Sequence, residues 1–124
     1  MNATVKEWIT KAEGDYATAG RELHATESPN YDAVCFHAEQ AVEKLMKAQL
    51  IHLGVTPPRT HDLMVLDRLL APVCPDWSWP AEELRLLTRA AVDFRYPGES
   101  ADKEEASEVF GAATRLCTKL KSLF

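Results

Sequence analysis

The sequence is poor in the residues that favour β-strands. It contains 8 valines and 2 isoleucines, against 17 alanines and 14 leucines. Valine and isoleucine favour strands, whereas alanine and leucine are the best helix formers. The imbalance argues against a fold built on a sheet and predicts an all-α protein.

Long apolar runs and paired cysteines are also missing. The longest uninterrupted apolar run is four residues, and the charged N-terminus has no apolar signal-peptide core. We therefore expect no membrane span and no membrane partner. The three cysteines, Cys35, Cys74 and Cys117, are an odd number without paired spacing, which is typical of a reducing, cytoplasmic compartment.

Positive charge is in short supply. The chain has 14 lysines and arginines but 19 aspartates and glutamates, which gives a formal net charge of −5. This balance argues against a broad basic surface for duplex DNA. Any site for an anion must therefore be a local pocket.

The seven prolines divide the chain into helical lengths, because proline is expelled from helix interiors. With the apolar periodicity, they predict helices over about 3–25, 31–53, 79–95 and 101–123, and a short helix between 60 and 71. We expect one domain over residues 1–124, an antiparallel up-and-down bundle of four to five helices.

Several details of this bundle can also be predicted. Thr60 and Ser100 are expected to cap the third and fifth helices. Gly14 and Gly20 are expected to mark close packing of the first helix. Four apolar residues are the ones we least expect to be fully buried in a monomer. They are Phe36, Trp77, Trp79 and Phe124.

A stripe of polar side chains follows one face of the second predicted helix. His37, Gln40, Lys44 and Lys47 are separated by steps of three, four and three residues. The stripe could supply donors to a ligand. It could equally be a solvated face on which Glu43 and Lys47 form an i,i+4 pair.

Two further polar clusters lie where helices are expected to begin or end. Arg59 and His61 precede the short third helix, whose free amides suit an anion. Thr60 and Asp62 could instead simply cap that helix.

The other cluster consists of Arg85, Arg89, Arg95 and Tyr96. Arginine can hold phosphate through two parallel hydrogen bonds, and tyrosine can stack on a base. These arginines could instead complement the helix dipole or pair with Glu82 or Asp93.

Signals for metals and cofactors are weak. His37-Ala38-Glu39 matches half of a zinc deaminase signature, but the chain has no PCxxC sequence. It also has neither the ExxH pairs of di-iron bundles nor a glycine-rich phosphate loop. We expect no metal and no cofactor.

Four blocks of the sequence together resemble HEPN domain proteins. The first helix carries Trp8, Ala12, Asp15-Tyr16 and Ala19, and three longer blocks follow. They are CFHAEQAVEKLMKAQLIHLG at 35–54, PPRTHDL at 57–63 and FRYPGE at 94–99. The resemblance implies a bundle of four or five helices that commonly dimerises and binds a nucleotide or RNA. Many such proteins are encoded with a minimal nucleotidyltransferase, as in a toxin–antitoxin pair, and some are metal-independent endoribonucleases.

The endoribonucleases of that family carry an arginine followed by histidine after four to six intervening residues. None of the seven arginines here has a histidine in that window. The resemblance then implies a nucleotide- or RNA-binding module that forms a homodimer and works with a nucleotidyltransferase partner. The acidic composition argues against duplex DNA as its ligand. The candidate binding residues are Lys44, Lys47, Arg59, His61, Arg95, Tyr96 and His37.

Two alternatives stay open. One is a divergent endoribonuclease that uses His37 or His61 together with Arg95; its catalytic residues are otherwise unknown. The other is a module that only binds another protein through a helical face.

Overall fold

Five α-helices and no strands make up the fold, which confirms the all-α prediction. The computed structural model describes all residues from 1 to 124. The helices are α1 (Ala3–Leu23), α2 (Tyr31–His52), α3 (Leu63–Leu70), α4 (Ala81–Asp93) and α5 (Lys103–Ser122). None of them is both long enough and apolar enough to cross a bilayer.

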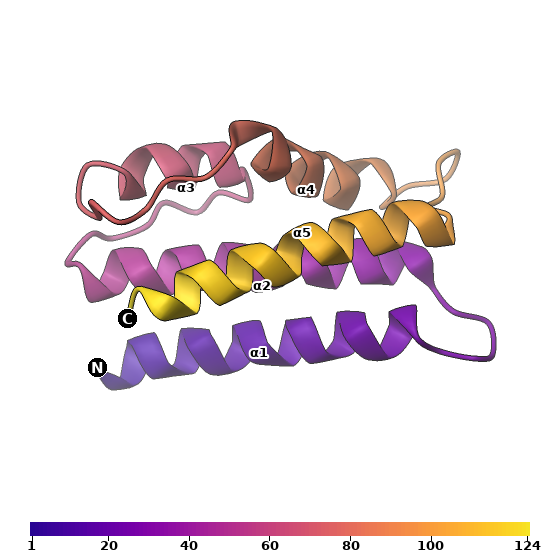
Figure 1. Cartoon of the computed structure of the whole chain (residues 1–124), viewed down its shortest axis with the longest axis horizontal. Helices are drawn as coiled ribbons and strands as arrows, with labels where there is room; N and C mark the ends of the chain where they lie inside the picture. The colour runs from indigo at the N-terminus through magenta and orange to yellow at the C-terminus, as the bar shows by residue number, and fades with distance from the viewer.

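Helix α2 lies at the centre of the bundle. It runs antiparallel to α1, while α3 and α4 follow one another along its opposite side and α5 packs across it (Figure 1). Thirteen of the 22 residues of α2 are buried, three of them charged. Helix α2 has neighbours on several sides, which explains why apolar residues cover more than one of its faces in the sequence.

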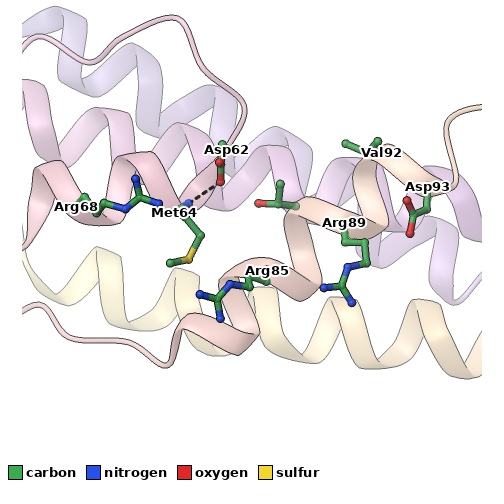
Figure 2. A pocket seen from close by; sticks show the side chains of 8 residues that line it. Asp62, Met64, Arg68, Arg85, Arg89, Val92 and Asp93 are labelled. Atoms are coloured by element: carbon green, nitrogen blue, oxygen red, sulfur yellow. Dashed lines mark hydrogen bonds between the residues drawn. The ribbon is translucent and has the colours of Figure 1, made fainter.

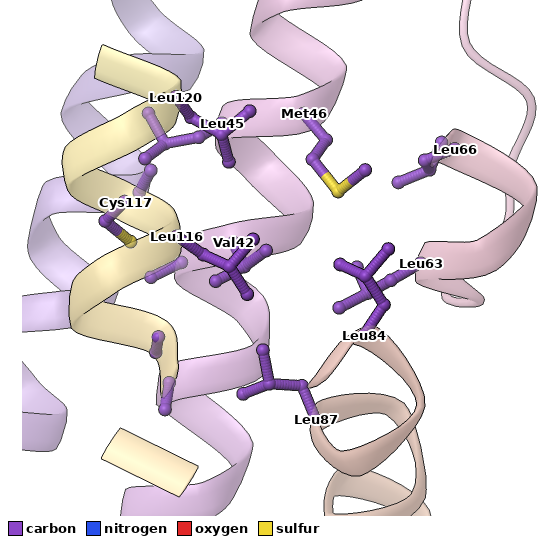
Figure 3. Close-up of a cluster of buried hydrophobic side chains, with 14 of the residues drawn as sticks. Val42, Leu45, Met46, Leu63, Leu66, Leu84, Leu87, Leu116, Cys117 and Leu120 are labelled. Carbon is purple, nitrogen blue, oxygen red and sulfur yellow. The ribbon is translucent and has the colours of Figure 1, made fainter. Parts of the chain in front are cut away.

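Leucine side chains from four helices fill the core around α2 (Figure 3). The figure shows Leu45 and Met46 of α2 between the side chains of α5 and those of α3 and α4. The contributing side chains are Leu63 and Leu66 of α3, Leu84 and Leu87 of α4, and Leu116 and Leu120 of α5. All of them are essentially inaccessible to solvent, so this core fixes how α3 and α4 are held against α2.

The helix ends differ from the predicted ones at two caps. Asp62, not Thr60, caps α3, and its carboxylate accepts the Met64 N–H at 2.9 Å. Asp102, not Ser100, caps α5, where it forms a capping box with Glu105. In both places the aspartate lies two residues after the expected cap, and a charged oxygen is a stronger acceptor at a helix N-terminus than a hydroxyl.

The glycine and tryptophan predictions hold only in part. Gly20 does lie in a close contact, because a Cβ there would be 3.4 Å from the Phe110 ring, but Gly14 has open space around it. Trp77 was expected to stay partly exposed and is buried instead, with 4% of its surface accessible. Its indole N–H donates to Asp67 at 2.8 Å, which satisfies the one polar atom of the ring.

Candidate functional site

The polar stripe of α2 is not a solvated face. Lys47 of the stripe is buried, with 7% of its surface accessible, and His37, Gln40 and Lys44 are partly buried. Glu39 and Glu43 of the same helix are also buried, with 1% and 3% of their surfaces accessible. Buried charges need partners, since an unpaired one costs several kcal/mol. The arrangement of those partners defines the candidate site.

Asp15 of α1 holds two of the predicted binding residues. Its Oδ1 accepts a hydrogen bond of 2.8 Å from Nδ1 of His37, and its Oδ2 forms an ion pair with Lys44. Because Nδ1 carries the proton that Asp15 accepts, the other ring nitrogen of His37, Nε2, is left as the one available to a ligand.

Glu43 holds two more of them. Its Oε2 lies 3.1 Å from Nζ of Lys47, and its Oε1 accepts a hydrogen bond of 2.9 Å from Nδ1 of His61. Nζ of Lys47 also lies 5.9 Å from the centre of the Trp8 ring. The pair predicted between Glu43 and Lys47 therefore forms, but inside the protein and not on a solvated face.

Glu39 is the most perturbed carboxyl group of the chain. Burial, assisted by the nearby charge of Glu43, raises its pKa from 4.5 to about 8, although a hydrogen bond from Gln40 and the charge of Arg95 act in the opposite direction. One of its oxygens, Oε1, is buried without a hydrogen-bond partner. Glu39 is therefore mainly neutral at pH 7, so it adds little negative charge to the buried side of α2.

His37 and Arg95 line the same pocket, although they are far apart in the sequence. The pocket has a volume of about 380 Å³ and lies between the start of α2 and the end of α4. The guanidinium of Arg95 stacks over the Phe36 ring, 5.4 Å from its centre, and forms no ion pair. We call this the His37–Arg95 pocket; it offers a free cation, a ring nitrogen and an aromatic surface.

The other predicted residues lie outside this pocket. His61 is anchored on Glu43, yet 75% of its side chain is exposed. Arg59 is exposed in the segment between α2 and α3, and Tyr96, 64% exposed, follows α4 next to Arg95 in the sequence. The structure thus joins Lys44 to His37 through Asp15 and Lys47 to His61 through Glu43. Arg59 and Tyr96 form no ion pair with either group.

Sequence reasoning missed the acidic members of this site. Asp15 lies on the buried face of α1, three residues after Ala12 and four before Ala19. Spacing along α1 does not show that it contacts His37, because that contact depends on how α1 and α2 pack. Glu39 and Glu43 did carry a signal, since they share a face of a helix whose surroundings are mostly apolar. No group of three or more histidine, cysteine or acidic side chains is placed so that it could hold a metal ion.

The HEPN domain family model matches residues 5–123 of this chain. The chain belongs to the HEPN family. This HEPN domain is similar to two crystal structures. TT1696 from Thermus thermophilus has a TM-score of 0.78 and 22% identity, with 97% of this chain and 98% of that chain covered. ST0689, described as an archaeal HEPN homologue, has a TM-score of 0.68 and 25% identity, with 95% of each chain covered. A comparison with curated protein sequences found no match.

Proposed function

We propose that this HEPN domain binds a nucleotide or RNA in the His37–Arg95 pocket. The observation that supports the proposal most is the unpaired guanidinium of Arg95 on an aromatic ring, beside a histidine, in a pocket of about 380 Å³. Ligand pockets typically hold roughly 300–1,000 Å³ and orient their ligands with a few polar groups. Arginine suits phosphate because its planar fork can form two parallel hydrogen bonds.

The predicted residues then take different roles. Arg95 contacts phosphate, His37 donates or accepts through Nε2, and exposed Tyr96 stacks on a base or bonds to a ribose. Lys44 and Lys47 act indirectly, because each already neutralises a carboxylate that would otherwise repel the ligand.

Arg59 and His61 would contact only a longer ligand. Both are exposed and lie in the segment that leads into α3, away from the His37–Arg95 pocket. Replacement of Arg59 or His61 should therefore leave the affinity for a mononucleotide unchanged, whereas the affinity for an RNA oligomer should fall.

Binding can be measured by fluorescence anisotropy with labelled single-stranded RNA and by thermal shift with nucleotides. Arg95→Ala should weaken binding about tenfold or more, since a hydrogen bond to a charged group contributes about 1.5–3 kcal/mol. The slope of log affinity against log salt should also fall by about 0.7 for each phosphate contact removed. Arg21→Ala, at an exposed position of α1, is the matched control. Equal affinity of both variants and the wild type would contradict the proposed site.

We also propose that the domain forms a homodimer and works with a minimal nucleotidyltransferase. This proposal rests on the membership of the HEPN family. Light scattering after size exclusion measures the first claim, and co-purification with a nucleotidyltransferase encoded beside it measures the second. A monomer at micromolar concentration, or separate elution of the two proteins, would contradict the respective claim.

A second candidate function is metal-independent cleavage of RNA. The observation that favours it is the series Asp15, His37 and Arg95, in which a carboxylate orients a histidine in a pocket that also contains an unpaired arginine. Nε2 of His37 could accept the proton of a ribose 2′-hydroxyl as its oxygen attacks the adjacent phosphorus. The bond to the 5′-oxygen breaks, that oxygen takes a proton from water, and a 2′,3′-cyclic phosphate remains. Arg95 would neutralise the charge that develops on the phosphorane.

Incubation of purified protein with RNA in excess chelator tests this candidate. Cleavage should disappear in His37→Ala and persist in His61→Ala, because His61 lies outside the pocket. Cleavage that survives His37→Ala, or RNA left intact by the wild type, would rule out this mechanism without affecting the binding proposal.

A further inference from the structure

A second pocket lies between α3 and α4, away from the His37–Arg95 pocket. Its volume is about 460 Å³, and no residue that lines it also lines the His37–Arg95 pocket. Three arginines contribute to its wall: Arg68 from α3, and Arg85 and Arg89 from α4. Figure 2 shows Arg68 and Arg85 pointing toward each other across Met64, with Arg89 further along α4. We call it the three-arginine pocket.

None of these three guanidinium groups has a partner in the protein. The ion pairs of the chain use Arg115, lysines and histidines, and the side-chain hydrogen bonds of arginine come only from Arg21 and Arg115. The chain has 19 acidic side chains and seven arginines. Three unpaired arginines in one pocket of so acidic a protein are therefore a local concentration of positive charge.

The spacing of the α4 arginines adds to this argument. Arg85 and Arg89 are four residues apart, so they share one face of α4 with a separation of about 6 Å along its axis. Like charges at this spacing destabilise a helix, and an anion bound between them would remove the repulsion. The sequence interpretation that these arginines pair with Glu82 or Asp93 is not supported, since neither pair is present.

Carboxylates lie near the three-arginine pocket without neutralising it. Asp62 and Asp93 line it, but Asp62 caps α3 through the Met64 N–H, as the dashed line in Figure 2 marks. The lining therefore carries three positive and two negative charges, an excess of one positive charge. Glu82, Glu83 and Glu108 lie beyond Arg85 and Arg89 in an adjoining hollow, where Glu83 is already paired with Arg115.

We propose that the three-arginine pocket binds two adjacent phosphate groups. Three guanidinium groups can donate more hydrogen bonds than the two oxygens of one carboxylate can accept. Two linked phosphates supply enough oxygens and negative charge for all three arginines. Such a pair could come from a nucleoside di- or triphosphate or from neighbouring nucleotides of an RNA strand. The two pockets share no lining residue, so this proposal does not depend on binding at His37 and Arg95.

Inorganic pyrophosphate is the probe for this pocket, and calorimetric titration is the measurement. The wild type should bind pyrophosphate saturably, and Arg85→Gln and Arg89→Gln should each weaken this binding about tenfold or more. Arg21→Gln should leave pyrophosphate affinity within about twofold of the wild type, because that side chain lies on α1 and lines neither pocket. All three positions are exposed, so circular dichroism should show intact folds.

Three results would overturn the proposal. They are the absence of saturable binding at millimolar pyrophosphate, unchanged affinity in both α4 variants, and binding of poly-glutamate as tight as that of pyrophosphate. The last result would assign the pocket to an acidic protein segment. Parallel titrations with ATP and with a short single-stranded RNA distinguish the two phosphate sources, because the natural source should bind more tightly than pyrophosphate and lose affinity in the same variants.

Discussion

Replacement of Glu39 by glutamine should change how the stability of the protein depends on pH. Burial raises the pKa of this carboxyl to about 8 from an ordinary value of 4.5. Between these two values the native state keeps the proton and the unfolded state releases it. The stabilisation is thus fully present below about pH 4.5 and is lost as the pH rises toward 8. Each pH unit in that interval costs about 1.4 kcal/mol, or roughly 4 kcal/mol between pH 5 and pH 8.

Glutamine is a close substitute for the protonated acid. Its amide oxygen can accept from Gln40, and its NH₂ can donate to Glu43, so the variant should fold without the titration. Urea denaturation followed by circular dichroism at pH 5, 6, 7 and 8 gives the free energy of unfolding of each protein. The stability of Glu39→Gln relative to the wild type should rise by several kcal/mol across this range. Glu27→Gln, at an exposed loop position, should follow the wild type. A constant difference between Glu39→Gln and the wild type at all four pH values would refute the reasoning.

Three further predictions concern the scaffold, and denaturant titration checks each of them. Gly14→Ala should stabilise the protein by about 0.5–1 kcal/mol, whereas Gly20→Ala should gain less because its Cβ would meet the Phe110 ring; equal gains would contradict the contact. Asp102→Ala removes the carboxylate that accepts the Glu105 N–H in the α5 capping box and should cost about 1–2 kcal/mol, and a neutral effect would argue against the box. Leu45→Ala in the core should cost about 2–5 kcal/mol, so a loss under about 1 kcal/mol would mean that the site is not packed as described.

The helices could be predicted because their signals are local. Proline positions and apolar periodicity predicted all five helices. The caps at Thr60 and Ser100 were assigned two residues early, and α4 begins at Ala81 instead of residue 79. The buried position of Trp77 could not be predicted in the same way. It depends on Asp67 being within reach of the indole N–H, which the irregular segment after α3 determines.

The site was harder to predict than the fold for a related reason. Spacing along α2 correctly put His37, Lys44 and Lys47 on one face. It also allowed Glu43 to pair with Lys47. It could not show that Asp15 of α1 holds His37 and Lys44, or that Arg95 shares a pocket with His37. Those contacts join residues from different helices, and their geometry follows from tertiary packing, which periodicity does not encode.

The central claim is that this HEPN domain binds a phosphate-bearing ligand through the His37–Arg95 pocket. The most direct test is a two-dimensional ¹H–¹⁵N NMR titration of the labelled protein with a short single-stranded RNA. We predict saturable shifts at His37, Arg95 and Tyr96 that vanish in Arg95→Ala. Shifts confined to other surfaces, or none at millimolar RNA, would contradict the claim.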